Sequence, residues 1–128
     1  NIMSKQIIHT DDAPAAVGTY SQAVKVGDTV YISGQLGLDP KTMTLKEGFK
    51  AQAEQAMDNL QAIAKAAGGS LSDAVKFNVS LTDLSDFATL NEVFNARLSK
   101  PYPARAAVQV AALPKDGVVE IEAILHLS

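Results

Sequence analysis

Hydrophobic and polar residues alternate with a period of two in the last two runs of the chain, residues 104–112 and 119–127. Alternation of this kind indicates strands with one apolar and one polar face. Between them, residues 113–117 read Leu-Pro-Lys-Asp-Gly, which is typical of a turn. The sequence therefore predicts a hairpin of these two strands, with alanine, valine, isoleucine and leucine side chains on its buried face.

The polar face of this predicted hairpin carries Arg105, Gln109, Glu120 and Glu122. Arg105 has alanine on both sides, so its guanidinium is free to grip a carboxylate through two parallel hydrogen bonds. A glutamate nearby can orient or activate a water. Spacing alone favours a plainer interpretation, in which Arg105 and Glu120 form an exposed pair on a solvated sheet face.

A second hairpin is predicted where Gly27-Asp28 separates two β-rich runs, residues 23–26 and 29–33. The second run leads into Ser33 and Gly34, and a glycine inside a strand pattern indicates a bulge or a close backbone approach. Gly34 is therefore a candidate for offering a bare backbone N–H to a ligand.

Apolar residues at three- and four-residue spacing predict helices over 47–67 and 86–98, and residues 74–81 alternate as a strand between them. Residues 6–8 are a short extended candidate. This order predicts an α+β fold, a mixed sheet with the two helices on one face. The other face is expected to be covered by water or by another copy of the chain.

The composition is that of one soluble globular domain spanning residues 1–128, since 47% of the residues are hydrophobic and 20% are charged. The chain has no cysteine, and its two histidines are far apart, so we expect no metal site. The net charge of −3 and the lack of a basic cluster argue against nucleic acid as a partner. Asn1-Ile2 before Met3 are expected to be a remnant of processing or expression.

No apolar run approaches the roughly 18 residues of a membrane span, and no signal peptide is recognisable. We therefore expect a cytoplasmic protein without a membrane partner. Two further polar residues are candidates for a site. Tyr20 leaves a loop rich in proline and glycine, where it is expected either to pack or to cover a pocket. Asn91 lies beside the apolar stripe of the second helix and faces either a cleft or solvent.

Four segments in order carry a resemblance to a known family: Ala13–Ala23, Ile32–Gln35, Asp83–Asn91, and the run from Pro103-Ala104-Arg105 to Glu120-Ile121-Glu122. Together they resemble the RidA family, also called YjgF, of reactive-intermediate (imine) deaminases. The resemblance covers nearly the whole chain, and its last segment looks like the family's signature.

The resemblance implies a homotrimer of chorismate-mutase-like subunits, with the sheets forming an inner barrel, the helices outside and ligand clefts between subunits. It implies hydrolysis of 2-imino acids, or of their enamine tautomers such as 2-aminoacrylate and 2-aminocrotonate, to 2-keto acids and ammonia. It also implies that no cofactor or metal takes part.

Residue by residue, the resemblance makes Arg105 the carboxylate anchor and Glu120 the group that positions water or transfers protons. Tyr20 matches a tyrosine at the cleft mouth, and Ser33, Gly34 and Asn91 match positions that line the cleft. Residue 107 is often cysteine in the family and is alanine here. We expect the backbone carbonyl of Ala107 to hold the imine nitrogen, which an alanine allows.

Two other functions remain open at this stage. The same cleft is compatible with a non-catalytic sensor or regulatory protein that binds small carboxylic acids. RNA cleavage is reported for relatives, but the acidic charge balance argues against it. From the wide separation of Arg105 and Glu120 along the predicted hairpin, about 13 Å, we predict that a neighbouring subunit completes the Arg105 pocket, with Tyr20 or Asn91 as the contributor.

Overall fold

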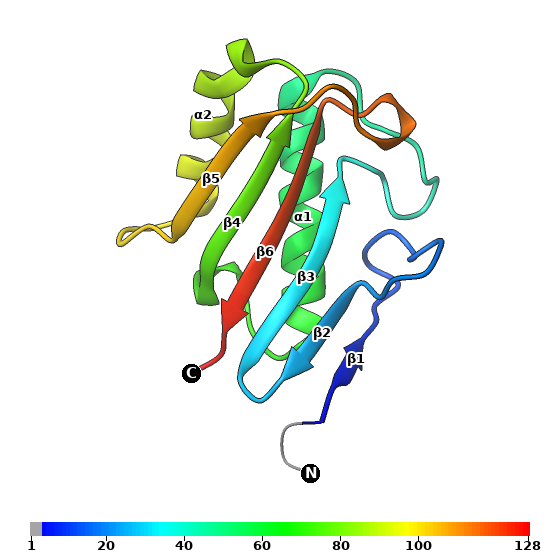
Figure 1. Ribbon diagram of the computed structural model, residues 1–128, viewed down its shortest axis with the longest axis vertical. Coiled ribbons are helices and arrows are strands. Elements are labelled where there is room, and N and C mark those ends of the chain that lie inside the picture. Colours follow the sequence, from blue (N-terminus) through cyan, green and yellow to red (C-terminus); the bar gives the residue numbers. More distant parts are fainter. Residues whose placement is uncertain (1–3) are drawn as a thin grey trace.

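Residues 4–128 are the part of the chain that the computed structural model describes. They form a mixed six-stranded sheet with two helices on one face (Figure 1). The predicted α+β class and the single helix layer are thus confirmed, whereas the expectation for residues 1–2 lies outside the described residues. In sheet order the strands are β1 (Gln6–Ile8), β2 (Ala23–Val26), β3 (Thr29–Leu36), β6 (Val119–His126), β4 (Ala74–Leu81) and β5 (Ala104–Gln109). The helices are α1 (Phe49–Ala66) and α2 (Phe87–Arg97).

Most predicted elements are confirmed to within two or three residues of their ends. Helix α1 ends before Gly68, whose φ of 97° is easily adopted by glycine. The tight turn between β2 and β3 is present, with Gly27 at a φ of 60°. The register of β3 against β6 shifts between Ile32 and Gln35, so the bulge predicted at Gly34 is confirmed.

The predicted hairpin of β5 and β6 is wrong. Strand β6 lies between β3 and β4 and is antiparallel to both, whereas β5 lies at the sheet edge and runs parallel to β4. Parallel neighbours need a crossover connection, and α2 provides it between β4 and β5. Residues 113–117 therefore carry the chain from the edge across β4 to the centre of the sheet (Figure 1).

The predicted orientation of β5 is also wrong. Arg105 pairs in register with Phe77, which is fully buried against the helices, so Arg105 faces the helix layer. Val108, which the alternating pattern predicts on the buried face, is 53% exposed. The alternation in β5 indicates only weakly which face is buried, because alanine occurs on both faces, at Ala104 and Ala106 on one and at Ala107 beside Arg105 on the other.

The orientation predicted for β6 is confirmed. Val119, Ile121, Ala123 and Leu125 are buried, each 2% exposed or less, and Glu120 and Glu122 lie on the other face. The buried face packs on α1, where the predicted stripe supplies Met57, Leu60 and Ala64. A strand with one complete apolar face and two neighbours suits the centre of the sheet, whereas the small residues of β5 suit an edge.

Replacing Ile121 by alanine tests the central position of β6. Because Ile121 is fully buried in the core, Ile121→Ala is expected to lower the free energy of unfolding by about 2–5 kcal/mol. Ile7→Ala, at a side chain that is 57% exposed on β1, is the matched control and should cost less than about 1 kcal/mol. Urea unfolding at one protein concentration measures both. Similar losses for the two variants would contradict this placement of β6.

Candidate active site

Two separate hollows contain all the candidate residues except Ala107. The first, which we call the Arg105 hollow, lies between α2, the start of β5 and the segment that joins them, and has a volume of about 660 Å³. Its lining is Phe77, Ala88, Asn91, Glu92, Phe94, Asn95, Leu98, Tyr102, Pro103 and Arg105. A hollow of this size accommodates a small organic acid.

Arg105 is held in its hollow by aromatic rings. Its guanidinium carbon lies 5.3 Å from the ring centre of Phe87 and 5.2 Å from that of Phe94. Among residues 4–128 it makes no ion pair. A guanidinium that packs on aromatic rings keeps its N–H donors in its own plane, where they stay available to a ligand. This site therefore suits the two oxygens of a carboxylate.

The second hollow, which we call the Glu120 hollow, has a volume of about 480 Å³ and lies where β3, β6 and three loops meet. Its lining is Pro14, Ala15, Val17, Tyr20, Ser33, Gly34, Gln35, Leu36, Leu38, Met43, Pro114, Lys115, Glu120 and Glu122. It therefore gathers four of the predicted site residues, Tyr20, Ser33, Gly34 and Glu120.

Gly34 leaves the space that the side chain of Glu120 occupies. A Cβ atom added at Gly34 would lie 2.8 Å from Cδ of Glu120 and 3.0 Å from its Cγ and Oε1. The contact of 2.8 Å is shorter than Cβ atoms make in proteins, so a larger residue at this position would displace the carboxyl group of Glu120. The bulge of β3 and the absence of a side chain at residue 34 together leave the room that Glu120 occupies.

Glu120 is half-buried, and its carboxyl group has no hydrogen bond within the described part of the chain. Burial raises the pKa of Glu120 above its ordinary value of 4.5, and the neighbouring charge of Glu122 raises it further. A carboxyl group with a raised pKa exchanges a proton more readily near neutral pH, as acid–base catalysis requires.

Tyr20 and Ser33 lie at the rim of the Glu120 hollow. Tyr20 is 49% exposed, and its hydroxyl oxygen accepts a hydrogen bond of 3.3 Å from the backbone N–H of Val17. The hydroxyl of Ser33 donates to the backbone oxygen of Ser21 at 2.6 Å. Both oxygens keep a lone pair for a ligand, and Tyr20 also keeps its O–H donor.

Buried amide side chains hold the loops around the Glu120 hollow. Gln22 accepts from the backbone N–H of Thr10 at 2.7 Å and donates to the backbone oxygen of Pro14 at 2.8 Å. Gln52 joins two loops, since it accepts from the N–H of Val118 and donates to the oxygen of Lys46, both at 3.0 Å. Sequence reasoning missed both residues.

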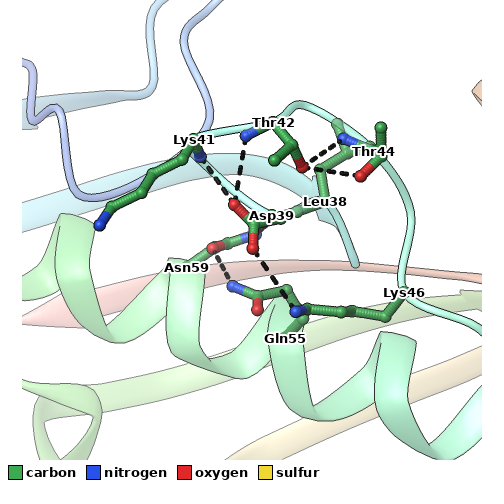
Figure 2. A network of polar contacts seen from close by, with 8 residues as sticks. All are labelled: Leu38, Asp39, Lys41, Thr42, Thr44, Lys46, Gln55 and Asn59. Atoms are coloured by element: carbon green, nitrogen blue, oxygen red, sulfur yellow. Dashed lines mark hydrogen bonds and ion pairs between the residues drawn. The ribbon is translucent and has the colours of Figure 1, made fainter.

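A third buried amide, Asn59 of α1, fixes the end of β3 and the loop after it. Its Nδ2 donates to the backbone oxygens of Leu36 at 3.2 Å and Leu38 at 3.0 Å, and Gln55 donates to its Oδ1 at 2.8 Å. Figure 2 shows Asn59 with Gln55 and Leu38 beneath the turn at Asp39. The seven-residue spacing of Gln52 and Asn59, which places them on one helix face, was the available sequence signal.

The turn above Asn59 is closed by Asp39. Its carboxylate accepts from the backbone N–H groups of Lys41 at 2.8 Å and Thr42 at 3.2 Å, and it pairs with Lys46 at 3.5 Å (Figure 2). These backbone donors, that of Lys41 first, lower the pKa of Asp39. The turn thus holds Leu38 and Met43, which line the Glu120 hollow.

The structure separates the predicted site residues into two groups. Asn91 lies beside Arg105 in the same chain, so no second copy is needed to bring it there. Tyr20, Ser33 and Gly34 accompany Glu120.

Ala107 belongs to neither lining. It lies on the same face of β5 as Arg105 and packs against the core. The role expected for its carbonyl stays a prediction.

Arg105 and Glu120 point to opposite faces of the sheet. Arg105 contacts α2 on the helix side, whereas Glu120 alternates with residues buried on that side. Their strands are separated by β4, which places the backbones about 10 Å apart. One small ligand therefore cannot touch both groups of a single chain.

Comparison with known proteins identifies the class of this chain. The family model described as Endoribonuclease L-PSP matches residues 10–127, and the chain belongs to this family, which is the RidA/YjgF family predicted from the four segments. The Bos taurus protein named 2-iminobutanoate/2-iminopropanoate deaminase is 54% identical over 121 residues, which cover 94% of this chain and 88% of that protein.

Solved structures agree with the fold. The crystal structure of RidA from Psychrobacter sp. PAMC 21119 has a TM-score of 0.94 and 80% sequence identity, covering 95% of this chain and 99% of that one. The crystal structure of E. coli TdcF with bound serine has a TM-score of 0.90 and 44% identity, covering 96% of this chain and 99% of that one.

No group of three or more histidine, aspartate or glutamate side chains among residues 4–128 is arranged to hold a metal ion. No helix in this part of the chain is long and apolar enough to cross a membrane.

The raised pKa of Glu120 predicts a pH-dependent cost in stability. Because the fold disfavours the charged form, stability falls as the pH rises from 4.5 through the raised pKa. Glu120→Gln, which stays neutral, should therefore increase the free energy of unfolding relative to wild type at a pH of about 7, and change it much less at a pH of about 4.

Urea unfolding at the two pH values measures this difference. Glu47→Gln is the control, because Glu47 is exposed and lines neither hollow. A Glu120→Gln variant that is less stable than wild type at neutral pH would contradict the burial cost of Glu120.

Proposed function

We propose that the chain is an imine deaminase, which hydrolyses 2-imino acids and their enamine tautomers, of the 2-aminoacrylate and 2-aminocrotonate type, to 2-keto acids and ammonia. The observation that carries the proposal is the unpaired guanidinium of Arg105, stacked on Phe87 and Phe94 at the wall of a hollow. It is supported by relatives named 2-iminobutanoate/2-iminopropanoate deaminase, such as the Bos taurus protein.

The proposed site lies between two copies of the chain. The Arg105 hollow binds the substrate carboxylate, and the Glu120 hollow of a neighbouring copy supplies the proton-transfer group. Separation of the two residues on opposite sheet faces supports this arrangement, and so do Tyr31 and Val108, which are 52% and 53% exposed on the face that no helix covers. We propose a homotrimer in which these open faces form an inner barrel.

Within such a site, Glu120 moves the protons of the reaction. In its ionised form it removes a proton from a water that attacks the carbon of the protonated imine, forming a C–O bond. Glu120 then gives this proton to the amino nitrogen and takes up the proton of the new hydroxyl group as the C–N bond breaks. Ammonia leaves, the C=O bond of the 2-keto acid forms, and Glu120 returns its proton to ammonia or water. A protonated imine is already electrophilic, so positioning and one proton-transfer group are sufficient help.

The other candidate residues orient the substrate in this proposal. Gly34 offers its backbone N–H, Ser33 and Tyr20 offer hydroxyl groups beside Glu120, and Asn91 offers an amide beside Arg105. The carbonyl of Ala107 holds the imine nitrogen. No cofactor is required, because water is the only co-reactant.

A sensor of small carboxylic acids is the second candidate, since one relative, E. coli TdcF, was solved with bound serine. Such a protein would use the Arg105 hollow without turnover. Calorimetry with 2-ketobutyrate, on protein that fails the deaminase assay, distinguishes the two. Binding without turnover would favour the sensor.

A coupled assay tests the deaminase directly. A dehydratase generates 2-aminocrotonate, and the rate of 2-ketobutyrate formation is compared with the spontaneous rate. Arg105→Ala is expected to lower kcat/KM on the order of 10²-fold, because the carboxylate loses its anchor. Arg105→Lys should recover only part of the loss, since an ammonium group cannot form the two parallel hydrogen bonds.

Arg97→Ala is the matched control, because Arg97 pairs with Asp58 outside both hollows. It should retain wild-type turnover. Equal rates for wild type, Arg105→Ala and the reaction without protein would refute the proposed activity.

A further inference from the structure

Strand β6 presents two carboxylates on one face, and their surroundings differ. Glu120 is half-buried and has no hydrogen-bond partner among residues 4–128, whereas Glu122 is exposed and accepts from Nδ2 of Asn78 at 3.0 Å. Asn78 lies directly opposite Glu122 on β4, so the contact spans the strand pair. Residues two apart on a strand lie roughly 7 Å apart, close enough for their charges to interact.

The other polar and charged groups near this pair come from β4, from β6 itself and from two loops. On the β4 side Ser80 lies opposite Glu120, and Lys76 lies two positions beyond Asn78. On β6 itself, His126 follows Glu122 by four residues. Lys115 and Tyr20 line the same hollow from two of its three loops.

The β3 side contributes no charge to the pair. Leu36 lies opposite Glu120 there, and Gly34 allows the side chain of Glu120 to pack directly on the β3 backbone. The side chain of Glu120 therefore lies over Gly34 of β3, and Glu122 is the next side chain of β6 on the same face.

We propose that Glu122 is a positioning residue of the site, held by Asn78 so that its carboxylate keeps a proton available on Glu120. This inference rests on the proposed deaminase function, in which Glu120 transfers protons, and adds a residue to it. Glu122 touches no substrate in this scheme and acts only through Glu120.

The electrostatics of the pair agree with this geometry. Burial is the first cause that raises the pKa of Glu120, and the charge of Glu122 is the second. Two carboxyl groups in different surroundings commonly divide acid and base tasks between them. Here Asn78 satisfies one oxygen of Glu122, while Glu120 is left without a donor.

The test is the pH profile of kcat/KM in the coupled assay. The titration of Glu120 in the wild-type protein, followed by carbon-13 NMR of labelled glutamate side chains, first identifies the limb that belongs to Glu120. Glu122→Gln removes the neighbouring charge with little change in shape, and should move that limb to lower pH, whether Glu120 acts as acid or as base. Asn78→Ala, which keeps both carboxylates but frees Glu122, should move it in the same direction by less.

Glu47→Gln makes the same charge change at an exposed site outside both hollows and should leave the limb in place. Thermal unfolding and size-exclusion chromatography check that each variant keeps its fold and assembly. A Glu120 limb that stays at its wild-type pH in Glu122→Gln, or moves to higher pH, would overturn the proposal.

A second readout separates this proposal from the proposed function. Carbon-13 NMR of labelled glutamate side chains follows the titration of Glu120 without any substrate. The Glu120 titration should move to lower pH in Glu122→Gln, and an unmoved titration would again overturn the proposal. If wild type lacks deaminase activity, the proposed function fails, while this titration still decides whether Glu122 controls the proton on Glu120.

Discussion

The central position of β6 is the constraint on which the rest of the structure depends. Its apolar face forms the middle of the core against α1, and its two edges pair with β3 and β4. Because side chains alternate along a strand, burial of Ile121 forces Glu120 and Glu122 onto the open face. The same placement leaves β5 at the sheet edge, with Arg105 turned toward α2.

The candidate site is made of groups that the fold holds at some cost. Burial disfavours the charged form of Glu120, and the guanidinium of Arg105 has no carboxylate partner in the described chain, only two aromatic rings. Charged groups without a partner are typical of sites that bind ligands, and they do not stabilise the fold. Buried amides such as Gln22 and Asn59 hold the loops in place around Glu120.

Sequence patterns predicted the helices, β4 and the buried face of β6, because a full apolar stripe leaves little doubt about orientation. They were misleading for β5, whose alanines make its two faces nearly equivalent. Its pairing with β4 depends on the crossover through α2, which a local pattern does not contain. The family resemblance supplied the candidate residues, and the predicted hairpin already set Arg105 apart from Glu120, but only the structure places them on opposite faces of the sheet.

We propose that one active site takes the Arg105 hollow from one copy of the chain and the Glu120 hollow from the next. Mixing inactive Arg105→Ala and Glu120→Gln subunits, unfolded and refolded together in equal amounts, tests it most directly. Random assembly makes roughly one quarter of such sites wild type in both halves, so deaminase activity should return to about that fraction. If each site were contained within one chain, the mixture would stay as inactive as its components.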